Sequence, residues 1–171
     1  MHRLKSTTLL LALALPLAGC AGARLTETIR NPYSGPPIQS IAIDPRGGVM
    51  GDQIAVELAN SGLNILDSDH TAHLALRQEG KFPINSPEGH EELRVGGVDA
   101  LLVVRAMIGW DGKPQIVKAQ LISTHTSDVI TDLSWQNGWG GEFGSVADRT
   151  MRKSMSEAAR QISELLLTRI G

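Results

Sequence analysis

Alternating apolar and polar residues open the body of the chain and predict a strand, a helix and a second strand. The strands are expected at residues 38–44 and 64–67, and apolar residues at helical spacing predict the helix at about residues 50–60. Gly62 follows where a left-handed C-terminal cap is expected. Three elements this close together predict a βαβ unit or a split one.

The second half of the pattern predicts three consecutive antiparallel strands. Residues 98–108 are apolar on both faces, which is typical of a central, covered strand. Asp111 and Gly112 then favour a hairpin turn. Alternation within residues 115–124 and 129–137 predicts the other two strands.

Helices are expected between and after these strands. One is predicted at residues 69–78, and another where Ser86 can cap the first turn and Pro87 can occupy it. Apolar residues at helical spacing predict one long amphipathic helix at residues 145–170, begun by a capping box in which Asp148 takes the acidic position.

These elements predict the fold class. We expect an α/β domain, in the sense of an α+β sandwich, at residues 38–171. It has a mixed sheet of about five strands, a βαβ-like start, a three-stranded antiparallel meander and a long C-terminal helix. No internal repeat competes with this single domain.

The first residues have the pattern of a secretory signal. Arg3 and Lys5 precede an apolar run at residues 7–18. A helix of that length is about 18 Å long, too short for a bilayer core of about 30 Å. Residues 1–19 are therefore predicted to be a signal peptide that is removed.

The end of that run, "LAGC" at residues 17–20, resembles the lipobox of bacterial lipoproteins. The resemblance implies that Cys20 carries the lipid, with palmitate as an expected acyl group, and becomes the first residue of the mature chain. Ala21 stands where an Asp is the usual inner-membrane retention signal, which implies the outer membrane with the domain in the periplasm. The alternative is that Cys20, the single cysteine, is an unpaired core thiol.

Residues 20–37 are predicted to be the lipidated cysteine and a short tether, because residues 21–37 lack apolar periodicity and end in turn residues. Fully extended, residues 21–37 span at most about 60 Å. The domain is therefore expected close to the membrane.

Charge narrows the classes of partner. Loss of residues 1–19 removes Arg3 and Lys5, which leaves 14 basic against 18 acidic residues. An acidic chain without a basic stripe is not expected to bind nucleic acid. No disulfide is possible after Cys20, so a packed core must stabilise the fold.

Three stretches carry a resemblance to a known family: "SGLNILDSD" at 61–69, "GVDALLVVRA" at 97–106 and "AQLISTHTSDVI" at 119–130. Together they resemble the periplasmic domain of the curli-secretion-channel (CsgG-like) lipoprotein family, a domain type also found in lipoproteins that activate penicillin-binding proteins. The likeness extends over roughly residues 38–168 and implies the fold and the compartment. Pore-forming members of the family need hairpins that cross the membrane, and no segment remains for them once the predicted strands and helices are placed. The activators use a long tether, whereas the tether predicted here is short.

A histidine pair is the candidate metal site. His70 and His73 lie one helical turn apart, close to Asp67 and Asp69, and two imidazoles at that spacing can share a metal ion. The same residue types are common at the start of a helix for electrostatic reasons. We expect no metal here and no cofactor elsewhere.

Signals of catalysis are weak. No GxSxG elbow occurs, and Ser127 and Asp128 lie near His125 only because they form one turn. His90 and His125 are predicted to be surface or turn residues. Glycine-rich backbone at the start of a helix can bind phosphate, but no Lys follows the glycines in residues 138–144 and Glu142 would repel an anion. These glycines are therefore predicted to connect sheet and helix.

Three tryptophans form the candidate partner surface. Folding the predicted meander places Trp110 and Trp139 at one end of the sheet and Trp135 about one strand pair inward. Tryptophan is enriched in interface hot spots, and we expect Trp139 to be the exposed member. The alternative is that these rings close the open end of the core.

These observations predict a non-enzymatic outer-membrane lipoprotein that binds or scaffolds other envelope proteins or its own copies. A second hypothesis is an accessory subunit of a secretion or export complex. A third is a metal-dependent enzyme that uses His70 and His73.

Overall fold

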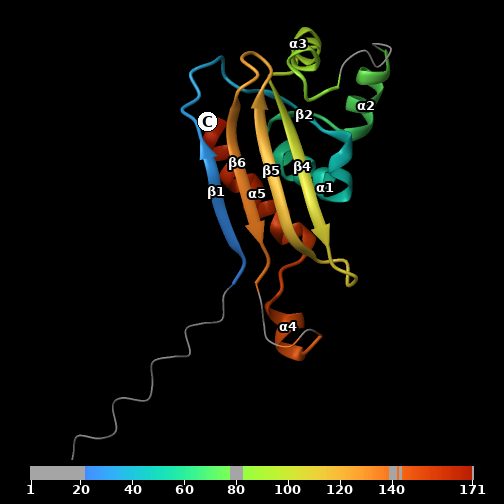
Figure 1. The fold of residues 1–171 in the computed structure, drawn as a ribbon, viewed down its shortest axis with the longest axis vertical. Helices are drawn as coiled ribbons and strands as arrows, with labels where there is room; N and C mark the ends of the chain where they lie inside the picture. The colour runs from blue at the N-terminus through green and yellow to red at the C-terminus, as the bar shows by residue number, and fades with distance from the viewer. Residues whose placement is uncertain (1–21, 78–82, 139–141, 143, 171) are drawn as a thin grey trace, which may run out of the picture.

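A six-stranded mixed sheet forms the centre of the molecule, which confirms the predicted fold class (Figure 1). The computed structural model describes residues 22–77, 83–138, 142 and 144–170. The strands are β1 (Arg24–Arg30), β2 (Ser40–Ile43), β3 (Asn64–Leu66), β4 (Ala100–Ile108), β5 (Pro114–Ser123) and β6 (Val129–Gln136). The helices are η1 (Pro45–Gly47, a 3₁₀ turn), α1 (Gly48–Asn60), α2 (Ser68–Arg77), α3 (Pro87–Val95), α4 (Val146–Met151) and α5 (Met155–Ile170). The order across the sheet is β1-β6-β5-β4-β2-β3.

The βαβ-like start is present in the parallel part of the sheet. Strand β2 lies between β3 and β4 and runs parallel to both. Helix α1 connects β2 to β3, and Gly62 follows it with a φ of 91°, as its predicted capping role requires. The start of β2 is fixed by Asp99, whose Oδ2 accepts the backbone N–H groups of Gln39 and Ser40 at 2.9 Å.

The predicted antiparallel meander is formed by β4, β5 and β6. One strand was not expected: β1 pairs antiparallel with β6, so the prediction of a tether throughout residues 20–37 is wrong at Arg24–Arg30. Glu27 secures this strand. Its carboxylate accepts hydrogen bonds from Nε and Nη2 of Arg169 and from Oγ1 of Thr131, all at 2.8 Å.

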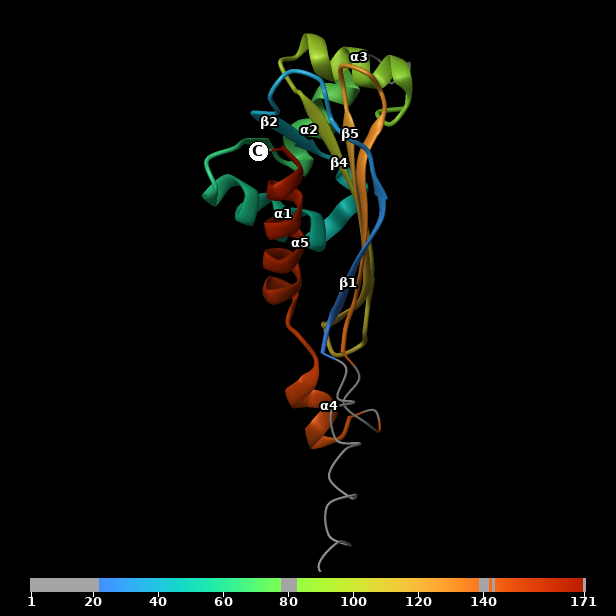
Figure 2. The same cartoon turned by 90° about the vertical axis from the view of Figure 1, so that its left-hand side faces the viewer.

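Helices α1 and α5 cover one face of the sheet and enclose the larger hydrophobic core (Figure 2). That core includes Ile41, Leu102 and Leu133 from the sheet, and Leu58 and Ile162 from the two helices. The opposite face has a smaller core next to α2 and α3. The two faces are therefore covered to different extents.

The single C-terminal helix predicted at residues 145–170 is wrong, because two helices occupy this range. Ser145 begins α4 as predicted, with its Oγ accepting the backbone N–H of Asp148 at 3.1 Å. Arg152 then adopts an extended conformation and ends α4. Helix α5 begins with a second capping box, in which Ser154 and Glu157 each accept the backbone N–H of the other.

Helix α3 begins as predicted, with Ser86 accepting the backbone N–H of Gly89 at 3.1 Å and with Pro87 in the first turn. Within the described ranges, the helices are too short or too polar for any of them to cross a bilayer.

Candidate functional site

Half of one sheet face carries no helix among the described residues (Figure 2). Because side chains alternate along a strand, β5 directs Val117 and Ala119 into the larger core and Lys118 and Gln120 to the opposite side. The half of that opposite side that lies beyond α3 is here called the uncovered face. Its residues are Arg24, Thr26, Arg105, Met107, Ile116, Lys118, Gln120, Asp132, Ser134 and Gln136.

Strand register arranges the uncovered face in rows that cross β4, β5, β6 and β1. One row is Arg105, Lys118, Ser134 and Thr26. The next row is Met107, Ile116, Gln136 and Arg24. Basic and apolar side chains thus lie side by side on neighbouring strands.

Electrostatics distinguishes the uncovered face from the rest of the chain. Arg105 lies directly opposite Lys118, and like charges in that position destabilise a sheet. Arg105, Lys118 and Asp132 line one pocket of about 300 Å³, and Asp132 is the carboxylate among the residues of this face. The buried carboxylate of Asp44, which is paired with Arg46, also interacts electrostatically with Arg105. With Arg24, three cations stand against one carboxylate, although the whole chain has a net charge of −2. This face suits an acidic partner.

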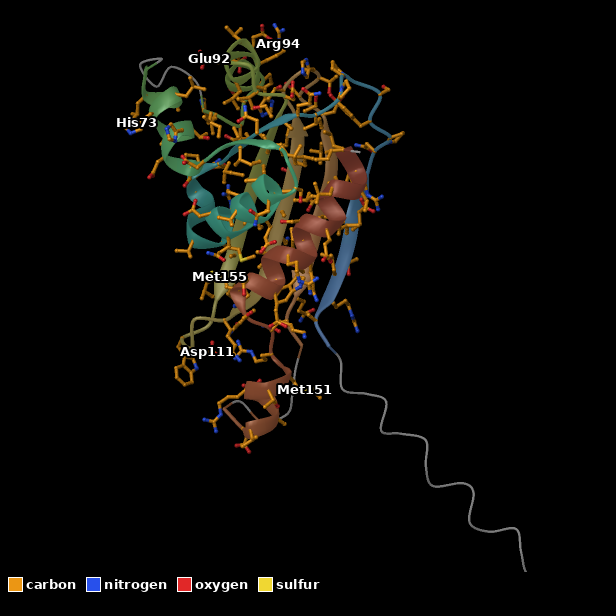
Figure 3. All side chains as sticks on the ribbon, turned by 180° about the vertical axis from the view of Figure 1, so that it is seen from behind. His73, Glu92, Arg94, Asp111, Met151 and Met155 are labelled. Carbon is orange, nitrogen blue, oxygen red and sulfur yellow. The ribbon has the colours of Figure 1, made fainter. Side chains whose placement is uncertain are left out.

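A second surface lies where the β4–β5 turn, the end of β6, the start of β1 and α4 meet (Figure 1). We call this region the hairpin end, and Figure 3 shows Asp111 and Met151 there. Trp110, in the turn, is 80% exposed. Trp110 and three other exposed apolar side chains of this region, Ile108, Val146 and Met151, are here called the hairpin-end patch.

Hydrogen bonds join α4 firmly to the hairpin turn. Arg152 is buried, and its Nη1 donates to Oδ2 of Asp111 at 2.8 Å, while Oδ2 of Asp148 lies 3.7 Å away. Nζ of Lys113 donates to the backbone carbonyls of Arg149 and Arg152 at 2.9 and 3.3 Å. The turn and α4 are therefore held as one unit.

The three tryptophans do not form one surface. Trp135 is fully buried, and its Nε1 donates to Oε1 of Gln161 on α5 at 2.7 Å. Its assignment to a partner surface is therefore wrong, and the ring closes the core as the alternative interpretation held. Trp110 is exposed at the expected end of the sheet. Trp139 lies outside the described residues, so its exposure remains a prediction.

Of the two histidines in α2, His70 has a local structural partner. Oδ1 of Asp67 accepts the backbone N–H of His70 at 2.8 Å and lies 2.8 Å from Nδ1 of the same residue. These hydrogen bonds, the backbone one most strongly, hold the pKa of Asp67 below its usual range. In the described part of the chain, no three His, Cys, Asp or Glu side chains are placed to hold a metal ion.

The two isolated histidines differ in their surroundings. His125 is a turn residue as predicted, with Nε2 at 3.3 Å from Oδ1 of Asp99. The surface position predicted for His90 is wrong, since its residue is only 3% exposed on the inner side of α3. Neither of its ring nitrogens has a hydrogen-bond partner among the described residues, and burial lowers its pKa.

The glycine-rich stretch leads from β6 to α4, as predicted. Gly144 has a φ of 81° and donates its N–H to Oδ2 of Asp148 at 3.1 Å. Residues 139–141 and 143 lie outside the described ranges.

No protein-family model and no curated protein sequence matches the chain. Among solved structures, it is similar to a PelC dodecamer from Paraburkholderia phytofirmans, with 15% identity, a TM-score of 0.48 and coverage of 87% of this chain and 98% of the other. A second PelC dodecamer from that species has 17% identity, a TM-score of 0.45 and coverage of 88% and 100%. Lipoprotein GNA1162 from Neisseria meningitidis has 17% identity, a TM-score of 0.45 and coverage of 75% and 99%.

None of these three structures is described as a curli channel or an activator of penicillin-binding proteins. All three TM-scores lie below 0.5, so these likenesses carry no argument about the function of this chain.

Proposed function

We propose that the chain is a lipoprotein anchored to the outer membrane at Cys20, which acts without catalysis in the periplasm as a binding or scaffolding module for other envelope proteins. The observation that carries this proposal is the uncovered face. The anchor follows from the "LAGC" motif at residues 17–20, and each buried methylene of its acyl chains contributes about 0.8 kcal/mol to membrane attachment.

The composition of the uncovered face favours a partner over plain solvation. Antiparallel sheets often expose one face to water, and such faces are normally polar. Here Met107 and Ile116 are exposed in one row, and Arg105 and Lys118 oppose each other in the next. Exposed apolar surface and opposed like charges both destabilise the free protein. A partner removes both effects when it covers the apolar side chains and places carboxylates against the two cations.

The proposed occupant is an acidic surface of another envelope protein. Arg24, Arg105 and Lys118 provide the complementary charge, which accelerates association and orients the partner. A second copy of this acidic chain and a subunit of an export channel are the competing occupants, and the test below separates them.

A photo-activatable amino acid at Gln120, which lies on the uncovered face beside these cations, tests this proposal in the full chain in intact cells. We expect a cross-linked product whose second component is another envelope protein. The matched control is the same replacement at Val56, which is exposed on α1 on the covered side of the sheet and should give no such product. A channel subunit in the product would support the export-complex hypothesis, and a dimer of this chain would identify self-association.

Charge reversal supplies the second arm of the test. Arg105→Glu with Lys118→Glu should abolish the cross-link formed from a probe at Gln120, whereas Glu164→Lys on α5 should leave it unchanged. If the probe at Gln120 gives no more product than the probe at Val56, the uncovered face is not a binding surface.

The anchor is tested separately with Cys20→Ser. This change should release the protein from the outer-membrane fraction or leave it uncleaved. A variant that is processed and still sediments with outer membranes like the wild type would contradict the lipid anchor.

A further inference from the structure

The first strand of the sheet begins at the hairpin end. Arg24 pairs with Gln136, and Gln136 pairs with Ile116, so the start of β1 lies beside the end of β6 and the start of β5. Cys20 precedes Arg24 by four residues. Four residues of extended chain reach at most about 15 Å. A lipid on Cys20 therefore keeps the hairpin end close to the membrane.

Exposed apolar side chains gather at this same end. The hairpin-end patch contributes side chains from β4, the turn and α4 that are between 37% and 80% exposed. Met107 and Ile116 belong to the uncovered face, and the other large apolar residues exposed in the described part of the chain are Ile29 on β1, Val49 and Val56 on α1, Leu76 on α2 and Val95 on α3. Apolar exposure is thus concentrated where the chain approaches the lipid.

We propose that the hairpin-end patch lies against the lipid headgroups of the membrane that holds Cys20, with the Trp110 ring at the depth of the interface. This inference rests on the proposed lipid anchor. Tryptophan is enriched at membrane–water interfaces because its ring is apolar and its N–H is polar. The anchor already keeps the patch at high local concentration, so the patch needs only to set the orientation of the domain.

The charges of the hairpin end fit a lipid surface. Arg149 is exposed there and can meet anionic headgroups, whereas the exposed Glu142 opposes them. The carboxylates of Asp111 and Asp148 both lie beside the buried guanidinium of Arg152. Repulsion between acidic side chains and the headgroups is thereby reduced.

The patch is also fixed as one surface. The Asp111–Arg152 ion pair and the hydrogen bonds from Lys113 to the end of α4 hold the turn and the helix together. Trp110 and Met151 therefore reach a lipid surface together, and the domain is oriented by two contacts besides the anchor.

Quenching of tryptophan emission by lipids with brominated acyl chains tests the proposal. The full-length acylated protein is reconstituted at about one copy per vesicle in anionic phospholipid, and it is compared with Trp110→Phe. We expect brominated lipid to quench the wild-type emission, and we expect Trp110→Phe to lose that part of the quenching. The control Trp110→Phe with Val95→Trp moves the exposed tryptophan to α3 at the opposite end and should not restore the loss.

Flotation with the vesicles and the mass of the N-terminal peptide are measured on the same samples. Protein without acyl mass that fails to float overturns the proposed anchor and this inference with it. Acylated protein that floats while wild type and Trp110→Phe are quenched equally overturns the orientation alone. Equal quenching of the Val95→Trp control also overturns the proposed orientation. A blue-shifted Trp110 emission without bromine quenching overturns it as well, because a second copy of the chain, and not lipid, then covers the patch.

Discussion

The imidazole ring of His90 links the stability of α3 to pH. It is buried without a hydrogen-bond partner in the described part of the chain, and burial lowers its pKa from the ordinary value of 6.5. Below about pH 6.5 the unfolded chain binds a proton at this position while the folded chain resists doing so. The free energy of unfolding therefore falls as the pH falls through that range, by at most about 1.4 kcal/mol per pH unit.

Replacing His90 by Leu should remove this dependence. His90→Leu deletes both unpartnered nitrogens and keeps an apolar side chain of similar length, so we expect stability at pH 7.5 equal to or above that of the wild type. Urea unfolding at pH 7.5, 6.5 and 5.5 measures the effect, and His73→Ala controls for the loss of an exposed histidine. A wild-type unfolding free energy that stays constant between pH 7.5 and 5.5 would contradict the assignment.

The two aromatic positions at the hairpin end illustrate what the sequence can specify about single residues. Turn chemistry at Asp111 and Gly112 correctly placed Trp110 beside the end of the sheet. It did not show which ring is buried, because the burial of Trp135 depends on α5, which lies over its face of β6 and supplies Gln161. His90 was missed for a related reason, since its helix contacts the sheet through residues distant in the chain.

Among the elements, α5 has a start that the pH can weaken. Hydrogen bonds from the backbone of Ser154, then from Lys153 and the Ser154 hydroxyl, lower the pKa of Glu157 to about 2. A carboxylate with a lowered pKa stabilises the fold above its ordinary value of 4.5, and this contribution is lost as the pH falls from 4.5 towards 2. The first turn of α5 is therefore most stable near neutral pH.

Ser154→Ala should lower the free energy of unfolding by about 1 kcal/mol, because the Oγ that accepts the backbone N–H of Glu157 is removed. Glu157→Gln keeps an acceptor oxygen but should flatten the stability profile between pH 4.5 and 2. Ser34→Ala, at an exposed position outside the helices, is the control. Urea unfolding gives the stability, and NMR titration of Glu157 gives its pKa. An ordinary Glu157 pKa would contradict the capping box.

The elements that sequence patterns missed have identifiable causes. Met151 and Met155 are four residues apart, so the apolar period continues through the break between α4 and α5, although the Ser-x-x-Glu pattern at residues 154–157 marks a second helix start. Strand β1 lost its alternation because Glu27 points inward to Arg169, a partner 142 residues away, and because a bulge follows it. Both errors arise from contacts that local periodicity does not contain.

For the molecule as a whole, β1 makes the segment before residue 38 part of the folded domain. A chain that begins at residue 38 loses this strand, exposes the edge of β6 and leaves Arg169 without Glu27. We expect its free energy of unfolding to be lower by on the order of 3 kcal/mol than that of a chain beginning at residue 22.

Urea unfolding of the two chains measures this difference, and size-exclusion chromatography detects association through the exposed edge of β6. Glu27→Gln in the longer chain is the matched control and should cause a smaller loss, because the strand remains paired. Equal stability of the two chains would mean that β1 contributes nothing to the fold.

The short link between Cys20 and β1, residues 21–23, also limits how far from the membrane this protein can work. With the proposed anchor, the link reaches at most about 15 Å, and the ten residues of β5 extend about 34 Å more. Every contact made by the uncovered face then falls within about 50 Å of the lipid surface. A partner fixed in the same membrane meets this face by lateral diffusion in two dimensions, whereas a partner on the opposite side of the periplasm has to extend to it.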